Sequence, residues 1–191
     1  MRAGLRYAIC AVGGVALGLG AAVQTVRAGA FGATERIGPW ATGTDFGTAD
    51  ASPRTRAVVA LRGLLALPAR EARYYTAALD DAGRPLDGRC RYRITGTAPD
   101  ARWWSLTLYD PDGYLVANNA KVYSIGSAAL TTPELARWTV IAAPDRRPGR
   151  WLPTGGLDRF ELTLRAYLPA GEGRANPPRA ALPAIVREAC A

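Results

Sequence analysis

Aromatic and arginine side chains alternate along several segments of the chain, and they are its best candidates for recognition chemistry. Aromatic rings give flat apolar contact to a sugar ring or a lipid headgroup, while arginine gives fixed donors to a carboxylate or a phosphate. A two-residue period places six such side chains, together with Glu161, on the polar faces of predicted strands: Arg91, Arg93, Trp103, Tyr109, Arg165 and Tyr167. We predict that they form a ligand-binding face; the alternative is that a helix, the C-terminal tail or a second subunit packs on it.

Three more ligand-binding candidates lie outside those strands. Asn118 and Tyr123 follow a predicted hairpin, where a loop can close over the polar face. Asparagine also satisfies the backbone of its own turn, which is the structural alternative for Asn118. Trp151, in the segment RWLPTGG, is predicted either to form a pocket wall or to cap the core.

Histidine is absent from all 191 residues. Its absence excludes the usual general base near neutral pH, the Ser-His-Asp and Cys-His arrangements, and most zinc and non-haem iron sites. The three cysteines are too dispersed along the chain for a metal knuckle. We therefore predict no catalytic residue, no metal and no cofactor.

Carboxylates leave one enzymatic alternative open. Asp110 and Asp112 lie in a predicted turn, and Asp80 and Asp81 precede a predicted loop. A glycosidase needs two carboxylates that face each other across a cleft, whereas turn chemistry alone accounts for these four residues. The alternative to a binding module is thus an enzyme that acts on envelope carbohydrate without histidine or metal.

Short alternating strands must position the candidate residues. Period-two patterns predict strands at 71–80, 90–95, 103–109, 114–116, 137–143 and 159–169. Asp110, Pro111 and Gly113 match the first, second and fourth positions of a type I turn, which makes a hairpin of the third and fourth strands. Because side chains alternate, Trp104 is predicted to point into the core and Trp103 onto the polar face.

One helix is predicted beside these strands, over residues 52–67. Ser52 is suited to its N-cap and Pro53 to its first helical position. Its apolar stripe includes Val58, Leu61 and Leu65. The predicted fold is therefore mainly β, an antiparallel β-sandwich or jelly-roll-like domain with one flanking helix.

The segment 7–26, YAICAVGGVALGLGAAVQTV, contains no charged residue, and as a helix it would span about 30 Å, the thickness of a bilayer's hydrocarbon core. Arg2 and Arg6 precede it, so the positive-inside rule predicts a single-pass protein of the bacterial inner membrane with its domain on the periplasmic side. The alternative is a signal peptide cleaved near residues 28–30. The predicted organisation is a cytoplasmic N-terminus at 1–6, a transmembrane helix at 7–26, a tether at 27–51 and an exported β domain at 52–191.

Export affects how the cysteines and glycines are interpreted. Cys90 and Cys190 would be the two thiols in an oxidising compartment, so we predict a disulfide between them; the alternative is two buried free thiols. Gly14 and Gly18 form a GxxxG pair that lets two membrane helices approach closely. A homodimer is therefore a further prediction.

The formal net charge of +8 is carried almost entirely by arginine, with Lys121 as the single lysine. These arginines are scattered along the chain, and only Arg146, Arg147 and Arg150 come close to a cluster. Phosphate recognition needs a concentrated basic face. We therefore predict no nucleic-acid partner.

Four segments occur in an order that resembles the bacterial domain-of-unknown-function family 1214, which also forms the C-terminal half of larger proteins carrying the 1254 domain. They are WWSLTLYDPDGYLVANN (103–119), VYSIG (122–126), RWLPTGG (150–156) and FELTLRAYLP (160–169). The resemblance covers residues 70–185 and implies a jelly-roll-like β domain, in its short form behind one membrane span, with no established reaction. The predicted function is a non-catalytic, membrane-anchored envelope module that binds a glycan, a lipid-linked molecule or a protein partner.

Overall fold

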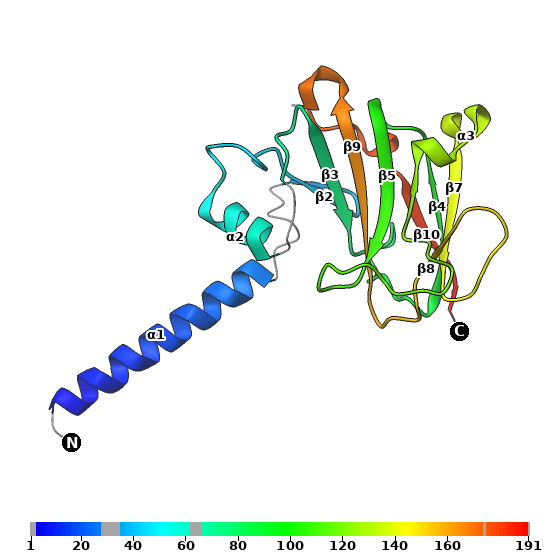
Figure 1. Cartoon of the computed structure of the whole chain (residues 1–191). Helices are drawn as coiled ribbons and strands as arrows, with labels where there is room; N and C mark the ends of the chain where they lie inside the picture. The colour runs from blue at the N-terminus through cyan, green and yellow to red at the C-terminus, as the bar shows by residue number, and fades with distance from the viewer. Residues whose placement is uncertain (1–2, 28–34, 62–65, 174, 191) are drawn as a thin grey trace.

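Two β-sheets make up the body of the molecule (Figure 1). The computed structural model describes residues 3–27, 35–61, 66–173 and 175–190. The six-stranded antiparallel sheet contains, in spatial order, β1 (Glu35–Ile37), β2 (Trp40–Thr42), β3 (Ala72–Ala77), β9 (Glu161–Pro169), β5 (Ala101–Tyr109) and β6 (Ser124–Gly126). The four-stranded sheet contains β10 (Ala184–Cys190), β4 (Cys90–Gly96), β7 (Trp138–Ala143) and β8 (Trp151–Pro153), of which β7 and β8 run parallel.

The hydrophobic core lies between the two sheets. Alternation along β5 directs Trp104, Leu106 and Leu108 inward, where each is at most 2% exposed. Trp104 stacks on Trp138 of the other sheet, with the ring centroids 5.0 Å apart, and this contact removes two large apolar surfaces from water. Trp103, by contrast, is 40% exposed. The predicted mainly β fold and the opposite orientations of the two adjacent tryptophans are both confirmed.

Helices are few in the described part of the chain, and they lie outside the sandwich. They are α1 (Ala3–Arg27), α2 (Pro53–Leu61) and α3 (Thr132–Ala136), with 3₁₀ turns η1 (Ser127–Ala129), η2 (Ala170–Gly173) and η3 (Arg179–Ala181). Figure 1 shows α1 projecting away from the sheets. Its residues 3–24 are long and apolar enough to cross a membrane, although a signal sequence near an N-terminus has the same properties.

α2 begins where the sequence predicts. The backbone N–H of Thr55 donates to Ser52 Oγ at 3.1 Å, so Ser52 supplies the N-cap interaction. Val58 is buried, as its place in the apolar stripe predicts. The described helix ends at Leu61, and residues 62–65 of the predicted helix lie outside the described residues. Residues 66–67 are not helical, so the predicted end of the helix at residue 67 is wrong.

Part of the segment predicted as a tether instead belongs to the six-stranded sheet, as strands β1 and β2. Trp40 of β2 is fully buried, and its Nε1 donates to the carbonyl of Pro183 at 2.8 Å. Gly38 joins the two strands with a φ of +63°, and the Arg179 side chain occupies the space where a Cβ would stand. Strands of three residues are too short to show a two-residue period, which is why the sequence pattern does not reveal them.

The predicted turn after β5 is present. Gly113 N donates to the carbonyl of Asp110 at 3.0 Å, and Tyr114 N donates to the Asp110 carboxylate at 2.8 Å. The predicted second arm, however, is reduced to one bridge between Tyr109 and Leu115. β5 pairs with β6 at that edge instead, so the hairpin prediction is right for the turn and wrong for the returning strand.

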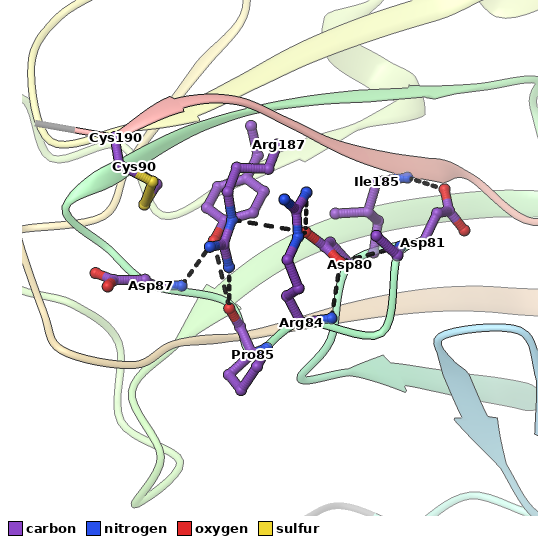
Figure 2. A network of polar contacts seen from close by, with 11 residues as sticks. Asp80, Asp81, Arg84, Pro85, Asp87, Cys90, Ile185, Arg187 and Cys190 are labelled. Carbon is purple, nitrogen blue, oxygen red and sulfur yellow. Dashed lines mark hydrogen bonds and ion pairs between the residues drawn. A yellow bond between two sulfur atoms is a disulfide. The ribbon is translucent and has the colours of Figure 1, made fainter.

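The predicted disulfide is present and fastens the C-terminal strand β10 to β4. Cys90 and Cys190 are direct partners in the register of these two strands, and their sulfur atoms are bonded. Figure 2 shows the bridge beside a network of ion pairs and hydrogen bonds between β10 and residues 80–87. In this network Arg187 Nε lies 3.6 Å from the Asp80 carboxylate. β10 is thus held covalently near its end and electrostatically along its length.

Candidate functional site

The outer face of the six-stranded sheet brings together four of the predicted ligand-binding residues. The antiparallel register of β5 and β9 sets Trp103 opposite Tyr167 and Arg165 opposite Ser105. Tyr109 lies further along β5 at an even spacing from Trp103, so its side chain points to the same face. We refer to Trp103, Tyr109, Arg165 and Tyr167 as the aromatic-arginine strip.

One end of the strip is a pair of aromatic rings. The ring centroids of Trp103 and Tyr167 are 5.2 Å apart, and the ring planes are inclined by 53°. Trp103 is the more exposed ring of the two, while Tyr167 is half-buried. The pair therefore presents a rigid apolar surface to solvent, of the kind that contacts the flat face of a sugar.

The other end of the strip is a contact between an arginine and a tyrosine. Arg165 Nη2 donates to the Tyr109 hydroxyl at 2.8 Å, and the guanidinium carbon lies 5.2 Å from the tyrosine ring centroid. The register places the pair Thr107 and Thr163 between these two residues, and both threonines are buried. The arginine–tyrosine contact thus crosses the position of the two threonines on the sheet face.

The β3 side of the same outer face is covered. Phe46, Ala72 and Tyr74 form a small buried cluster there, against which Val59 of α2 and Tyr167 pack. Burial raises the pKa of the Tyr74 hydroxyl above its usual value. On the β3 side, the outer face is therefore covered by other parts of the chain, which is the alternative named above. On the β5 side, Trp103 remains exposed to solvent.

Arg93 does not join the strip, and its predicted grouping with Trp103 is wrong. Alternation correctly assigns Arg93 to an outer face, but β4 belongs to the four-stranded sheet, on the other side of the core. There Arg93 and Arg91 both pair with Glu188 of β10, with Arg91 Nε 2.8 Å from the carboxylate. Trp151 belongs to this second sheet as well, and its Nε1 donates to the carbonyl of Ala143 at 3.0 Å.

Asn118 and Tyr123 lie in the segment between the turn and β6. The Asn118 amide donates to the carbonyls of Val116 and Val122, each at 3.0 Å, and its Oδ1 accepts from Val122 N at 3.1 Å. Asn118 therefore holds its own loop together, which is the structural alternative named for it. Tyr123 is half-buried directly before β6, and a ligand-binding role for either residue stays a prediction.

Two of the carboxylates that the enzymatic alternative invoked, Asp80 and Asp81, have structural partners. The side chain of Asp80 is 1% exposed and accepts hydrogen bonds from the backbone of Ala82 and from the Arg84 guanidinium, at 3.0 and 2.9 Å (Figure 2). Asp81 accepts from Ile185 N at 2.7 Å and pairs with Arg179. These two residues therefore fasten a loop to β10.

Two other carboxylates have pKa values unsuited to a general acid. Hydrogen bonds from Arg89 lower the pKa of Asp87 to about 2, and hydrogen bonds from Arg150 lower the pKa of Glu134 to about 2. A catalytic acid that works near neutral pH needs its pKa raised instead. Within the described residues, acidic and cysteine side chains form no group of three or more that could hold a metal ion.

The sequence pattern did not lead us to predict one charged side chain inside the sandwich. Arg73 of β3 is 1% exposed and lies opposite Ala166 of β9, on the inner face of the sheet. A signal for it exists, since Arg73 is spaced by two and four residues from Tyr75 and Ala77, which both point into the core. The segment 71–80 was predicted only as a strand, without assigning its faces.

Comparison with known proteins supports the fold. The model of a family described as "Protein of unknown function (DUF1214)" matches residues 71–171. A crystal structure of the VPA0106 protein from Vibrio parahaemolyticus is similar with a TM-score of 0.55 and 23% identity, over 72% of this chain and 36% of that chain. An uncharacterised protein from Burkholderia cenocepacia matches with a TM-score of 0.44 and 19% identity, over 62% of this chain and 30% of that chain. The chain thus spans about a third of the length of these structures, and no curated protein matches it.

Proposed function

The chain belongs to the DUF1214 family of proteins of unknown function, and from this premise we propose that it is a non-catalytic binding module of the cell envelope. Its ligand is an acidic saccharide, free or carried on a lipid, which binds to the aromatic-arginine strip. α1 anchors the module in the bacterial inner membrane, with the sandwich on the periplasmic side.

The observation that carries this proposal is the continuity of the strip. Trp103 and Tyr167 provide an apolar surface for a sugar ring, and Arg165 lies two residues along β9 from Tyr167. The Tyr109 hydroxyl already orients the Arg165 guanidinium, which leaves other N–H groups of the fork able to donate to a carboxylate or phosphate. One ligand with a sugar face and a negative group can therefore contact both ends of the strip.

Two further observations support the envelope location. α1 contains a span of sufficient length and hydropathy, and Arg2 and Arg6 stand on its N-terminal side. The disulfide between Cys90 and Cys190 suits an oxidising compartment such as the periplasm. Both agree with an exported domain.

Binding is tested with the full-length chain in lipid nanodiscs, probed on an array of neutral and acidic glycans and lipid-linked saccharides. We expect acidic saccharides to bind and Trp103→Ala to weaken them by about tenfold, because stacking on the exposed ring is lost. Tyr114→Ala is the matched control, since Tyr114 is a 71% exposed aromatic residue on the turn outside the strip. A blank array, equal loss in the two variants, or unfolding of Trp103→Ala would each count against the binding role of the strip.

Arg165→Gln tests the acidic part of the ligand separately. This variant should weaken acidic saccharides and leave binding of their neutral analogues unchanged, because the guanidinium contacts only the negative group. For the location, fractionation followed by alkaline extraction should leave the full-length chain in the membrane. Release of an intact or N-terminally cleaved soluble protein would refute the anchor.

A further inference from the structure

A groove of about 630 Å³ lies at the end of the four-stranded sheet where α3 leads into β7 (Figure 1). Its walls are formed by the last residues of β4, the first residue of β10 and the 3₁₀ turn η3. The side chains of Ala180, Leu182 and Ala184 make the lining mainly aliphatic, and none of the described lining residues is aromatic. A volume of this size is within the range of small-molecule sites, about 300–1,000 Å³.

Arg137 is the residue between α3 and β7, and it lines the groove. The next residue, Trp138, is buried in the core, so alternation directs the exposed Arg137 side chain to the opposite side of the sheet. The acid of the adjoining helix, Glu134, pairs with Arg150 instead, at 2.9 Å. Arg137 itself makes no hydrogen bond or ion pair within the described residues, so no described carboxylate balances its charge.

The second arginine of the groove, Arg179, is already engaged. Its Nη1 donates to the carbonyl of Leu182 at 2.7 Å, and its Nη2 pairs with the Asp81 carboxylate. Its side chain also fills the space beside Gly38. Arg179 therefore shapes one wall, and among the described lining residues the unbalanced positive charge is that of Arg137.

Two hydroxyl groups add hydrogen-bonding capacity beside that charge. Gly96 pairs with Trp138, so continuing the same register places Thr97 opposite Arg137. The backbone N–H of Ala98 donates to the carbonyl of Leu135 at 3.0 Å, which holds this segment against α3. The hydroxyls of Thr95 and Thr97 have no hydrogen-bond partner in the described part of the chain, so both can donate to an oxygen atom of a ligand.

We propose that this groove binds a medium-chain aliphatic carboxylate, with its carboxylate on Arg137 and its hydrocarbon chain along Ala180, Leu182 and Ala184. A guanidinium fork can donate to both oxygens of a carboxylate, and such charge-assisted bonds are about twice as strong as neutral ones. Because one positive charge is unbalanced, a monoanion fits the groove better than a dianion.

The lining selects the apolar part of the ligand. Aliphatic side chains remove an alkyl chain from water, whereas an aromatic ligand finds no ring to stack on among the described lining residues. The groove belongs to the four-stranded sheet and the aromatic-arginine strip to the six-stranded sheet. This second site therefore does not depend on the proposed function.

Calorimetry on the full-length chain in lipid nanodiscs tests the site, with the same titrations into empty nanodiscs subtracted. Octanoate is compared with octanamide, which keeps the chain without the charge, and with acetate, which keeps the charge without the chain. We expect octanoate to bind at least about tenfold more tightly than either, because it alone uses both parts of the groove.

Arg137→Gln should weaken octanoate by about tenfold and leave octanamide unchanged, because the charged partner of the carboxylate is lost. Arg159→Gln is its control and should change neither, since Arg159 is exposed, has no partner within the described residues and does not line the groove. Ala180→Trp should weaken octanoate and octanamide alike by about tenfold, because the indole occupies the groove. Its matched control is Ala128→Trp, since Ala128 is likewise the exposed central residue of a 3₁₀ turn, η1.

Equal binding of octanoate and octanamide, acetate binding as tight as octanoate, or unchanged octanoate binding in Arg137→Gln or in a folded Ala180→Trp would each overturn the proposal. Should Ala180→Trp fail to fold, the probe comparison and Arg137→Gln still decide it. Trp103→Ala must leave octanoate binding intact; a loss in that variant would assign octanoate to the strip and refute the groove.

Discussion

The bond between Cys90 and Cys190 should account for a large part of the stability of the sandwich. The two residues are 100 positions apart in sequence. Closing a loop of that length in the unfolded chain removes conformational entropy worth about 4.7 kcal/mol at 25 °C. In a domain of this size, that corresponds to a change in melting temperature of about 10–20 °C.

The structure indicates that reducing the disulfide would change the unfolded state, by raising its conformational entropy, more than it would change the folded state. Without the bond, Arg91 and Arg93 still pair with Glu188, and the backbone pairing of β10 with β4 still holds the strand in place. The folded state therefore keeps most of its contacts. The loss should appear as a lower free energy of unfolding with little change in the native far-ultraviolet circular dichroism spectrum.

The assay is urea unfolding of one protein in two redox states, so that the bond is the variable. Cys10→Ser provides the background, because Cys10 is exposed and would otherwise form intermolecular bonds. Cys190→Ser in that background must behave like the reduced protein, and it does so without a reductant. A difference of less than about 1 kcal/mol between the oxidised and reduced forms would refute the loop-closure reasoning.

Three further substitutions test local structure. Glu134→Gln should flatten the acid limb of the stability curve: the pKa of Glu134 is lowered from 4.5 to about 2, so its stabilising contribution is complete above pH 4.5 and is lost as the pH falls toward 2. Asn118→Ala removes three hydrogen bonds and should lower the free energy of unfolding by about 1–3 kcal/mol in chemical denaturation. Gly155→Ala should destabilise more than Gly149→Ala in the same measurement, because both have positive φ but only at Gly155 would the added Cβ lie 2.7 Å from a methyl carbon of Val116.

Controls for these substitutions remove similar groups from exposed positions. Asp112→Asn deletes a carboxylate from the exposed turn and should leave the acid limb as in the native protein, so an equal effect would contradict the role of Glu134. Asn119→Ala deletes the neighbouring exposed amide and should change stability by less than about 0.5 kcal/mol. Equal destabilisation of the two glycine variants would show that backbone strain alone matters.

The features that the sequence predicts well are those that depend on neighbours along the chain. Strict alternation in β5 correctly separates Trp103 from Trp104, and the Asp110 turn follows from local hydrogen bonding. Cys90 and Cys190 were predictable as a disulfide because they are the two cysteines of the segment predicted to enter an oxidising compartment, where only one pairing between them is possible. In each case a short-range rule or a simple count was sufficient.

The features that the sequence misses depend on which strands become neighbours. Alternation places Arg93 on an outer face, but sheet membership is decided by pairings with distant strands, and these put Arg93 against β10 instead of the strip. Arg73 was missed for a related reason. A guanidinium can occupy an inner position because groups far away in sequence, Thr42 and Asn176 among them, accept its hydrogen bonds.

The position of β10 has a consequence for how this protein is made. β4 lies between β7, which follows it by about 40 residues, and β10, which ends the described chain at residue 190. One edge of β4 therefore stays unpaired throughout synthesis until residues 184–190 emerge, and during that time its exposed backbone can pair with another chain. A deletion of β10 would thus produce a protein that aggregates as well as an unstable one, and a nascent chain is exposed to aggregation until residues 184–190 have been synthesised.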